Sequence, residues 1–241
     1  MVLSPEQFPA PYVLLNGLGL IVGLFLLDAI LARRAPDCRD TAYVLFVFAI
    51  LAGWFGAHLF DAASRGLPLR EAGFTFYGGL LSGALFYVLA GARRLSSAQI
   101  WRTLNCAVIP LVLGHAIGRV GCLLAGCCYG TFIGESAVRH PTQLYEAAGL
   151  FVIVGLLSTR QLRGRGLLVP LYLFAYAPLR FVLEFLRGDD RGFWLILSTS
   201  QWISLAMLSA GLAVGAWYMT QGDRTGGLAV ESSGSNSQSL G

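Results

Sequence analysis

The sequence predicts an all-α polytopic integral membrane protein, built as a bundle of about seven transmembrane helices. Of its 241 residues, 56% are hydrophobic and only 12% are charged, whereas about a quarter of the residues of a soluble domain carry charge. Apolar runs of roughly 20 residues, the length a helix needs to cross a bilayer core, recur from Tyr12 to Tyr218. This composition excludes an ordinary soluble domain and predicts a single membrane domain over residues 1–219.

Seven apolar runs account for these spans, each separated from the next by a short polar break. The first, residues 12–32, has no positive segment before it and no small-residue cleavage site after it, so we expect it to be retained. The next runs are residues 41–62, 74–92, 104–122, 142–159, 166–187 and 193–218. Residues 220–241 are rich in Gly, Ser, Asn and Gln, and we expect them to form a disordered cytoplasmic tail.

The positions of the arginines predict the orientation, because cytoplasmic loops are enriched in positive residues. Ten arginines fall on one side, namely Arg33, Arg34, Arg39, Arg93, Arg94, Arg102, Arg160, Arg163, Arg165 and Arg224, and five on the other, namely Arg65, Arg70, Arg139, Arg187 and Arg191. We therefore expect the N-terminus outside and the C-terminus in the cytoplasm. The arginines are scattered between apolar runs, so no nucleic-acid partner is expected. The remaining two, Arg119 and Arg180, lie within apolar sequence.

A polar stripe follows the sixth run. It consists of Tyr172, Tyr176, Arg180, Glu184 and Arg187, at spacings of four, four, four and three that share one face of a helix. A charged side chain inside a bilayer costs about 2.5 kcal/mol or more, so it marks a functional site by default. Arg180 and Glu184 also fit a purely structural ion pair. The two arginines and one glutamate leave surplus positive charge, which suits an anionic ligand such as a phosphate.

A glycine-rich stretch closes the fourth run. Gly114 and Gly118 are spaced for close packing against another helix, and His115 and Arg119 share a face at the same spacing. After Gly121 the glycines become too dense for a comfortable helix. We expect the span to end there in a turn whose backbone N–H groups can bind an anion.

Cysteines cluster directly after this stretch. Cys122, Cys127 and Cys128, with His115 and His140 near in sequence, raise the question of a metal site, but the spacing lacks the CxxC pairs typical of zinc. Packing as small apolar residues is the favoured interpretation, with a disulfide or a catalytic thiol as alternatives. The total of five cysteines is odd, so at least one stays outside any intrachain disulfide.

Two further motifs stand at the starts of runs. Pro141 and Thr142 mark the start of a helix, and Gln143 and Glu146 bring polar groups into the fifth run. Residues 74–80, Phe-Thr-Phe-Tyr-Gly-Gly-Leu, open the third run. Taken alone, that stretch indicates interfacial aromatic residues followed by packing glycines.

Taken together and in this order, the motifs resemble those of the prolipoprotein diacylglyceryl transferase family of bacterial inner membranes. The matching stretches are Gly-Leu at 17–18, Thr-Phe-Tyr-Gly-Gly-Leu at 75–80, Gly-Arg-x-Gly at 118–121, His-Pro-Thr-Gln-Leu-Tyr-Glu at 140–146 and Tyr-x-x-x-Arg-x-x-x-Glu-x-x-Arg at 176–187. The last two are the specific ones, and the resemblance covers residues 12–218. The family has seven spans with the N-terminus outside, which agrees with the orientation predicted above.

The resemblance implies transfer of a diacylglyceryl group from phosphatidylglycerol, a membrane lipid, to the lipobox cysteine of a preprolipoprotein. Glycerol phosphate is released, and no metal or diffusible cofactor is implied. The family's arginines map onto Arg119 and Arg180, which are expected to stabilise the leaving phosphate, with Glu184 orienting Arg180 and Tyr176 donating to the head group. The other candidates are Tyr77 and His140 for catalysis, and Arg187, Gly79, Gly121, Glu146, Gln143 and His115 for substrate binding.

The sequence also departs from the family's pattern. Tyr77 stands where the family has a histidine regarded as the base, Cys122 follows the arginine motif in place of asparagine, and Cys127 replaces an acid. The long outer insert of the family is reduced to about residues 130–139. These departures indicate a divergent branch.

Three hypotheses follow from the resemblance and the departures. The first is a diacylglyceryl transferase in which His115 or His140 replaces the missing base, since imidazole titrates near neutral pH. The second is a related phospholipid-dependent transferase with a different acceptor. The third is a catalytically silent protein that keeps Arg119 and Arg180 to bind lipid head groups.

Overall fold

The computed structural model describes residues 10–162, 167–188 and 193–234; within these ranges, the side chains of residues 64–65, 76–77, 193–194 and 219–234 are outside the description. The described chain is predominantly helical, which confirms the predicted all-α bundle. Its α-helices are α1 (Ala10–Arg34), α2 (Arg39–Arg65), α3 (Phe76–Gly91), α4 (Ser97–Leu124), α5 (Thr142–Leu162), α6 (Leu168–Glu184) and α7 (Thr199–Gly234). The remaining described elements are the short 3-10 helices η2 (Pro36–Cys38) and η3 (Leu69–Glu71) and a hairpin of β1 (Phe193–Trp194) and β2 (Leu197–Ser198).

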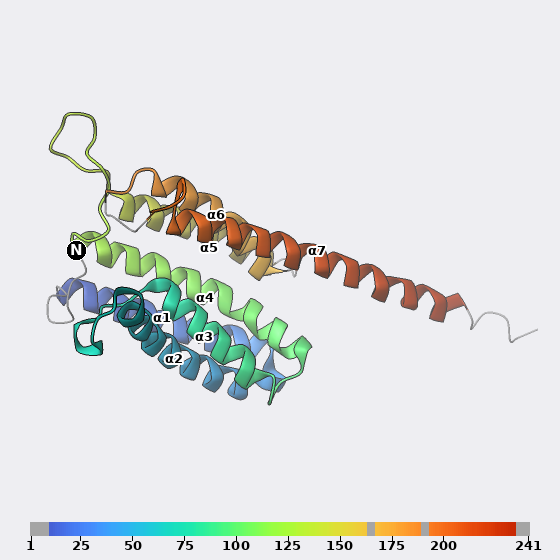
Figure 1. The fold of residues 1–241 in the computed structure, drawn as a ribbon. Coiled ribbons are helices and arrows are strands. Elements are labelled where there is room, and N and C mark those ends of the chain that lie inside the picture. Colours follow the sequence, from blue (N-terminus) through green and yellow to red (C-terminus); the bar gives the residue numbers. More distant parts are fainter. Residues whose placement is uncertain (1–9, 163–166, 189–192, 235–241) are drawn as a thin grey trace, which may run out of the picture.

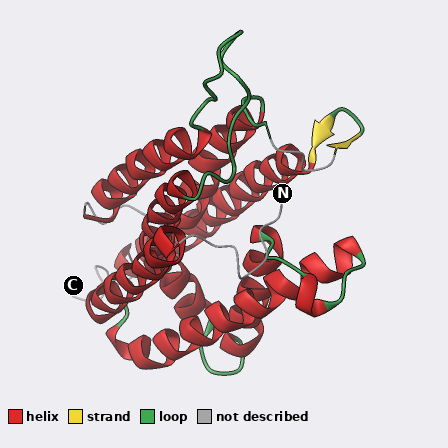
Figure 2. Cartoon of the chain, turned by 90° about the vertical axis from the view of Figure 1, so that its left-hand side faces the viewer, coloured by secondary structure: helices red, strands yellow, loops and turns green. Residues whose placement is uncertain are grey.

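The long helices run back and forth, so that successive connections alternate between the two ends of the bundle (Figure 1). Helix α4 is central, because α1 packs on it and α5 packs on it as well, while α2 packs mainly on α3 and α6 on α7. Figure 2 views the bundle from the end that carries the loop of residues 125–141 and the β1–β2 hairpin. We call this the hairpin end.

Glycines allow the closest helix contacts. A Cβ atom added to Gly19 of α1 would lie 2.9 Å from the carbonyl oxygen of Gly114 in α4, and one added to Gly53 of α2 would lie 2.9 Å from that of Gly79 in α3. Any side chain at these positions would force the helices apart, and helix association in a membrane depends on such close packing. The packing interpretation of Gly114 is confirmed, and Gly79 belongs to the α2–α3 contact.

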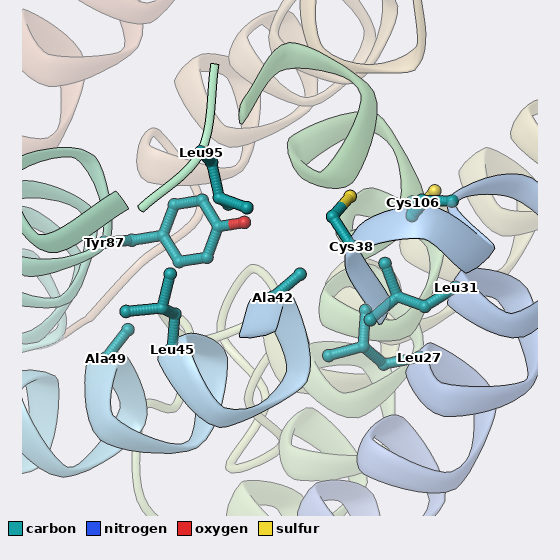
Figure 3. Packing of buried hydrophobic residues seen from close by; sticks show 10 residues of the cluster. Leu27, Leu31, Cys38, Ala42, Leu45, Ala49, Tyr87, Leu95 and Cys106 are labelled. Atoms are coloured by element: carbon teal, nitrogen blue, oxygen red, sulfur yellow. The ribbon is translucent and has the colours of Figure 1, made fainter. Parts of the chain in front are cut away.

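An apolar core joins α1, α2, α3 and α4 at the end opposite the hairpin end (Figure 3). Leu31, Leu45 and Tyr87 are buried in it. The ring of Tyr87 stacks on Phe46 with 4.1 Å between ring centroids, and its hydroxyl shares a 2.6 Å hydrogen bond with Thr103 of α4. The buried phenol therefore contributes apolar area without leaving its hydroxyl unsatisfied.

The described helices have the composition of a membrane protein. Four stretches are long and apolar enough to span a bilayer: α1, residues 36–63, α4 and α5. Helix α3 contains a shorter apolar stretch over residues 78–91, and α6 has 17 residues. Large apolar side chains face outward, such as Leu14 at 71% and Phe25 at 75% exposed. Such exposure is expected where lipid is the solvent, because lipid tails are as apolar as leucine.

The ends of two predicted segments, the fourth and the seventh, were wrong. Helix α4 continues to Leu124, so the prediction placed the end of this helix too early when it put it directly after Gly121. The seventh run starts as the β1–β2 hairpin, and α7 begins only at Thr199. Helix α7 continues to Gly234, beyond the expected end of the run at residue 218. A separate cytoplasmic tail at residues 220–241 stays a prediction.

The sixth run also ends early, and this changes the position of Arg187. Helix α6 stops at Glu184, so Arg187 does not continue the helical stripe. The chain beyond the helix pairs instead with the loop after α4: Thr131 N–H donates to the Leu186 carbonyl at 2.8 Å, and Arg187 forms an isolated antiparallel bridge with Gly130. These backbone bonds between distant segments replace another turn of α6.

Candidate active site

Glu146 is the centre of a buried polar cluster between α4, α5 and α6. Its side chain is 1% exposed, and its Oε1 lies 3.1 Å from Nη2 of Arg119 and 3.7 Å from Nε2 of His115. The hydroxyl of Tyr176 donates to the same oxygen at 2.7 Å. A carboxylate this deeply buried needs such partners, because burying an isolated charge is very unfavourable. The structure thus brings together four predicted site residues from three separate motifs.

Helix geometry and packing explain this cluster. His115 and Arg119 are four residues apart on α4, so they share a face, and α5 contacts both α4 and α6. The ring of Tyr176 meets the ring of His115 edge-on at 5.5 Å and stacks on Tyr172 at 5.5 Å. The aromatic contacts fix the side of α6 that faces Glu146.

A second buried cluster surrounds Arg180. This side chain is 3% exposed; its Nη2 lies 2.7 Å from Oε2 of Glu184 and donates to Oγ of Ser200 at 3.1 Å. Ser198 donates to the other oxygen of Glu184 at 2.8 Å. The predicted Arg180–Glu184 ion pair is confirmed, whereas the two serines were missed. Their signal was the polar run Ser-Thr-Ser-Gln at residues 198–201, which interrupts the apolar seventh run.

The two clusters adjoin along α6, since Tyr176 and Arg180 are one turn apart. Arg180 also interacts electrostatically with Glu146. Among the residues that the structure describes, Nε of Arg119 and Nη1 of Arg180 are buried without a hydrogen-bond partner. Arg187, 8% exposed, is a third buried arginine in this part of the chain. The unpaired N–H donors of Arg119 and Arg180 suit an anionic oxygen ligand.

The loop after α4 is anchored on the start of α5. Nε2 of Gln143 donates to the Cys127 carbonyl at 2.6 Å, and Oγ1 of Thr142 donates to the Cys128 carbonyl at 2.9 Å. One of the two N–H groups of the Gln143 amide is therefore bonded to the loop. The Sγ atoms of Cys122, Cys127 and Cys128 lie within 4.8 Å of one another, a convergence that their sequence spacing did not reveal. These three residues are able to hold a thiophilic metal ion.

No described contact brings the remaining candidates to the central carboxylate. His140 lies in the loop at the hairpin end, with its Nδ1 3.5 Å from the hydroxyl of Tyr145. Gly79 packs against α2, and a Cβ atom on Gly121 would lie 3.2 Å from an amide nitrogen of α1. Tyr77 is a residue of α3 whose side chain lies outside the described ones.

Comparison with known proteins identifies the family of this chain. Residues 10–217 match the family profile described as prolipoprotein diacylglyceryl transferase. A phosphatidylglycerol–prolipoprotein diacylglyceryl transferase 2 of Clostridium perfringens is 36% identical over 233 residues, covering 83% of this chain and 88% of the relative. The transferase of Clostridium tetani is 29% identical, covering 84% of this chain and 90% of the relative. The transferase of Cupriavidus necator is 32% identical, covering 78% of each. The chain belongs to the prolipoprotein diacylglyceryl transferase family.

Proposed function

We propose that this protein transfers the diacylglyceryl group of phosphatidylglycerol to the thiol of the lipobox cysteine in a preprolipoprotein, releasing glycerol phosphate and forming a thioether. The names of its relatives suggest this activity. The observation that carries the proposal is the pair of buried arginines, Arg119 and Arg180. Among the described residues, each has a guanidinium N–H without an acceptor.

The reaction needs such a pair of cations. The acceptor thiol loses its proton to water, its sulfur forms a bond to the glycerol carbon that bears the phosphate, and the carbon–oxygen bond to the phosphate breaks. The electron pair stays on the leaving glycerol phosphate, which gains negative charge. Guanidinium groups already fixed in a water-poor site stabilise that charge without reorganising during the reaction.

The two glutamates hold these cations in place. Glu146 lies 3.1 Å from Arg119, and Glu184 lies 2.7 Å from Arg180. Tyr176 was expected to donate to the head group, but in this structure its hydroxyl donates to Glu146. We infer that Tyr176 acts as a positioning residue on Arg119 through the carboxylate, and its donation to the head group stays a prediction.

The family supports placement in the inner membrane of a bacterium, and the arginine bias supports an N-terminus outside. Seven helices running back and forth put the two ends of the described chain on opposite sides of the bundle, as the predicted orientation requires. In this placement the hairpin end faces outward. The lipobox peptide approaches there, and phosphatidylglycerol enters from the bilayer.

The test is transfer by the full-length protein in detergent micelles that contain phosphatidylglycerol and a synthetic lipobox peptide. Mass spectrometry is expected to show the diacylglyceryl mass added at the peptide cysteine, together with released glycerol phosphate. Arg119→Ala and Arg180→Ala are each expected to abolish the product. Arg70→Ala is the matched control, because this side chain is 84% exposed and pairs with Glu71 in η3.

Three results would contradict the proposal. Lipid turnover without peptide modification indicates a transferase with another acceptor. Lipid binding without turnover indicates a silent lipid-binding protein. Near-normal transfer by Arg180→Ala contradicts the proposed role of Arg180 in stabilising the leaving phosphate, even though the protein is then a transferase.

A further inference from the structure

Three cysteine thiols converge where α4 meets the loop that follows it. Cys122 is in the last turn of α4, Cys127 and Cys128 are in the loop, and their Sγ atoms lie within 4.8 Å of one another. A zinc ion about 2.3 Å from each sulfur in a tetrahedral site holds the sulfurs about 3.8 Å apart. Small side-chain rotations therefore suffice to bring the three sulfurs to a common metal ion.

The backbone around the thiols is held in position. Cys128 has a φ of 61°, a left-handed conformation that is uncommon for a residue other than glycine. Its carbonyl accepts the bond from Thr142, and the carbonyl of Cys127 accepts the bond from Gln143. Uncommon backbone conformations persist only where the surroundings impose them. The two anchors on α5 thus preform the arrangement of the thiols.

Two arginines lie near the three thiols. Arg119 and Arg187 both interact electrostatically with Cys128, while Arg119 is already ion-paired with Glu146. Three thiolates carry three negative charges, and a divalent cation neutralises two of them. Thiolates select soft or borderline ions over Mg²⁺ and Ca²⁺, and Zn²⁺ is a divalent ion that cysteine sulfur binds in tetrahedral sites.

The thiols lie next to the proposed phosphate site. Arg119 precedes Cys122 by three residues on α4, and Gln143 precedes Glu146 by three residues on α5. Each pair is separated by about one helical turn. Three protein ligands leave the fourth tetrahedral position open, and catalytic zinc sites keep such a position for water or substrate.

We propose that Cys122, Cys127 and Cys128 bind Zn²⁺ and that its open position binds the acceptor thiol of the lipoprotein precursor; this rests on the proposed transferase function. On coordination the S–H bond breaks, the proton passes to water and a Zn–S bond forms. The sulfur then forms the C–S bond as the C–O bond to phosphate breaks, and glycerol phosphate leaves with the electron pair. The Zn–S bond to the thioether product then breaks, and the zinc ion stays on the three cysteines in its original oxidation state. No oxidant or reductant is consumed.

This assignment answers the question raised by Tyr77. The resemblance leads us to expect a histidine base at that position, and this chain has a tyrosine. A zinc-bound thiolate needs no separate base at the moment of attack, because the proton has already left. The three cysteines thus supply the activation that the substituted residue does not.

The first test is the metal content of the full-length protein after purification in detergent and dialysis against Zn²⁺ and then metal-free buffer. Elemental analysis is expected to find one zinc ion per chain. Cys122→Ser, Cys127→Ser and Cys128→Ser are each expected to lose it, and Cys106→Ser, a change in the apolar core at the other end, is expected to keep it. Absence of zinc from the wild type, a disulfide in its place, or retention in all three variants overturns the site.

The second test uses the protein loaded with Co²⁺, whose sulfur-to-metal absorption reports the ligands directly. Adding a lipobox peptide is expected to increase this absorption, and a matched peptide with serine in place of the acceptor cysteine is expected to leave it unchanged. Equal spectra with the two peptides overturn binding of the acceptor thiol. This readout does not depend on turnover.

The transfer assay separates this inference from the proposed function. The three serine variants are expected to lose transfer by roughly 100-fold or more, the loss typical when a reacting group loses the means of its deprotonation. Wild-type rates in the zinc-free variants overturn the role of the metal and leave the transferase intact. If zinc binds and the cobalt absorption responds to the peptide, but neither the wild type nor any variant catalyses transfer, the metal site is supported and the transferase function is overturned.

Discussion

Arg119 of α4 and Glu146 of α5 form an ion pair of 3.1 Å across a helix contact, with the carboxylate 1% exposed. Both side chains are largely shielded from water, so removing one of them leaves the other as an uncompensated buried charge. The contact that joins α4 to α5 is thus also the contact that orients the guanidinium. Stability and activity are expected to change together at this pair.

Glu146→Gln is expected to lower stability by about 3–5 kcal/mol, the range for breaking a buried ion pair. Transfer is expected to fall strongly because Arg119 loses its fixed orientation. Thermal unfolding in detergent and the transfer assay measure the two effects. The control is Glu135→Gln, since Glu135 is exposed in the loop after α4. A wild-type melting temperature in Glu146→Gln would show that the pair does not hold the helices together.

Tyr176→Phe removes the 2.7 Å hydrogen bond to Glu146 and keeps the ring that stacks on Tyr172. A hydrogen bond to a charged group contributes about 1.5–3 kcal/mol. As a positioning residue, Tyr176 is expected to affect kcat with little change in KM for the lipid. Tyr218→Phe, at an exposed position of α7, is the control. A rise in KM with unchanged kcat would mean that the hydroxyl binds the head group after all.

Tyr77→Phe is expected to keep most of the transfer activity, because the proposed zinc thiolate needs no base at this position. Tyr77→His, which restores the residue of the family pattern, is expected to give no large gain. Steady-state rates over several peptide concentrations check both. Loss of activity in Tyr77→Phe, with wild-type zinc content, would identify the phenol as a required group.

Gly130→Ala tests the pairing of the loop after α4 with the chain beyond α6. A Cβ atom there would lie 2.6 Å from the His140 carbonyl oxygen and 2.7 Å from that of Leu186. Forcing in a methyl group where there is no room costs about 1–3 kcal/mol, so faster proteolysis of the loop and a lower melting temperature are expected. Gly155→Ala is the control, because a Cβ atom meets nothing within 4 Å there. Equal effects of the two substitutions would contradict the tight pairing.

Interactions within one helix were predictable from the sequence. The Arg180–Glu184 pair, 2.7 Å in the structure, follows from the four-residue spacing, because helix geometry brings such side chains together whatever surrounds them. The same reasoning failed for Arg187. The spacing continues past Glu184, but backbone bonds to residues 129–131 end the helix, and these residues are over 50 positions away in the sequence.

The sequence by itself determined the helical membrane bundle, the family resemblance and the polar residues on each helix, since these depend on the length of apolar runs and on local spacing. Only the tertiary structure decided that Glu146 pairs with Arg119, that Tyr176 donates to Glu146 and that three cysteines converge beside them. The reason is that the rotation and depth of each helix come from contacts between helices, such as Gly19 on Gly114. No periodicity within a single helix contains that information.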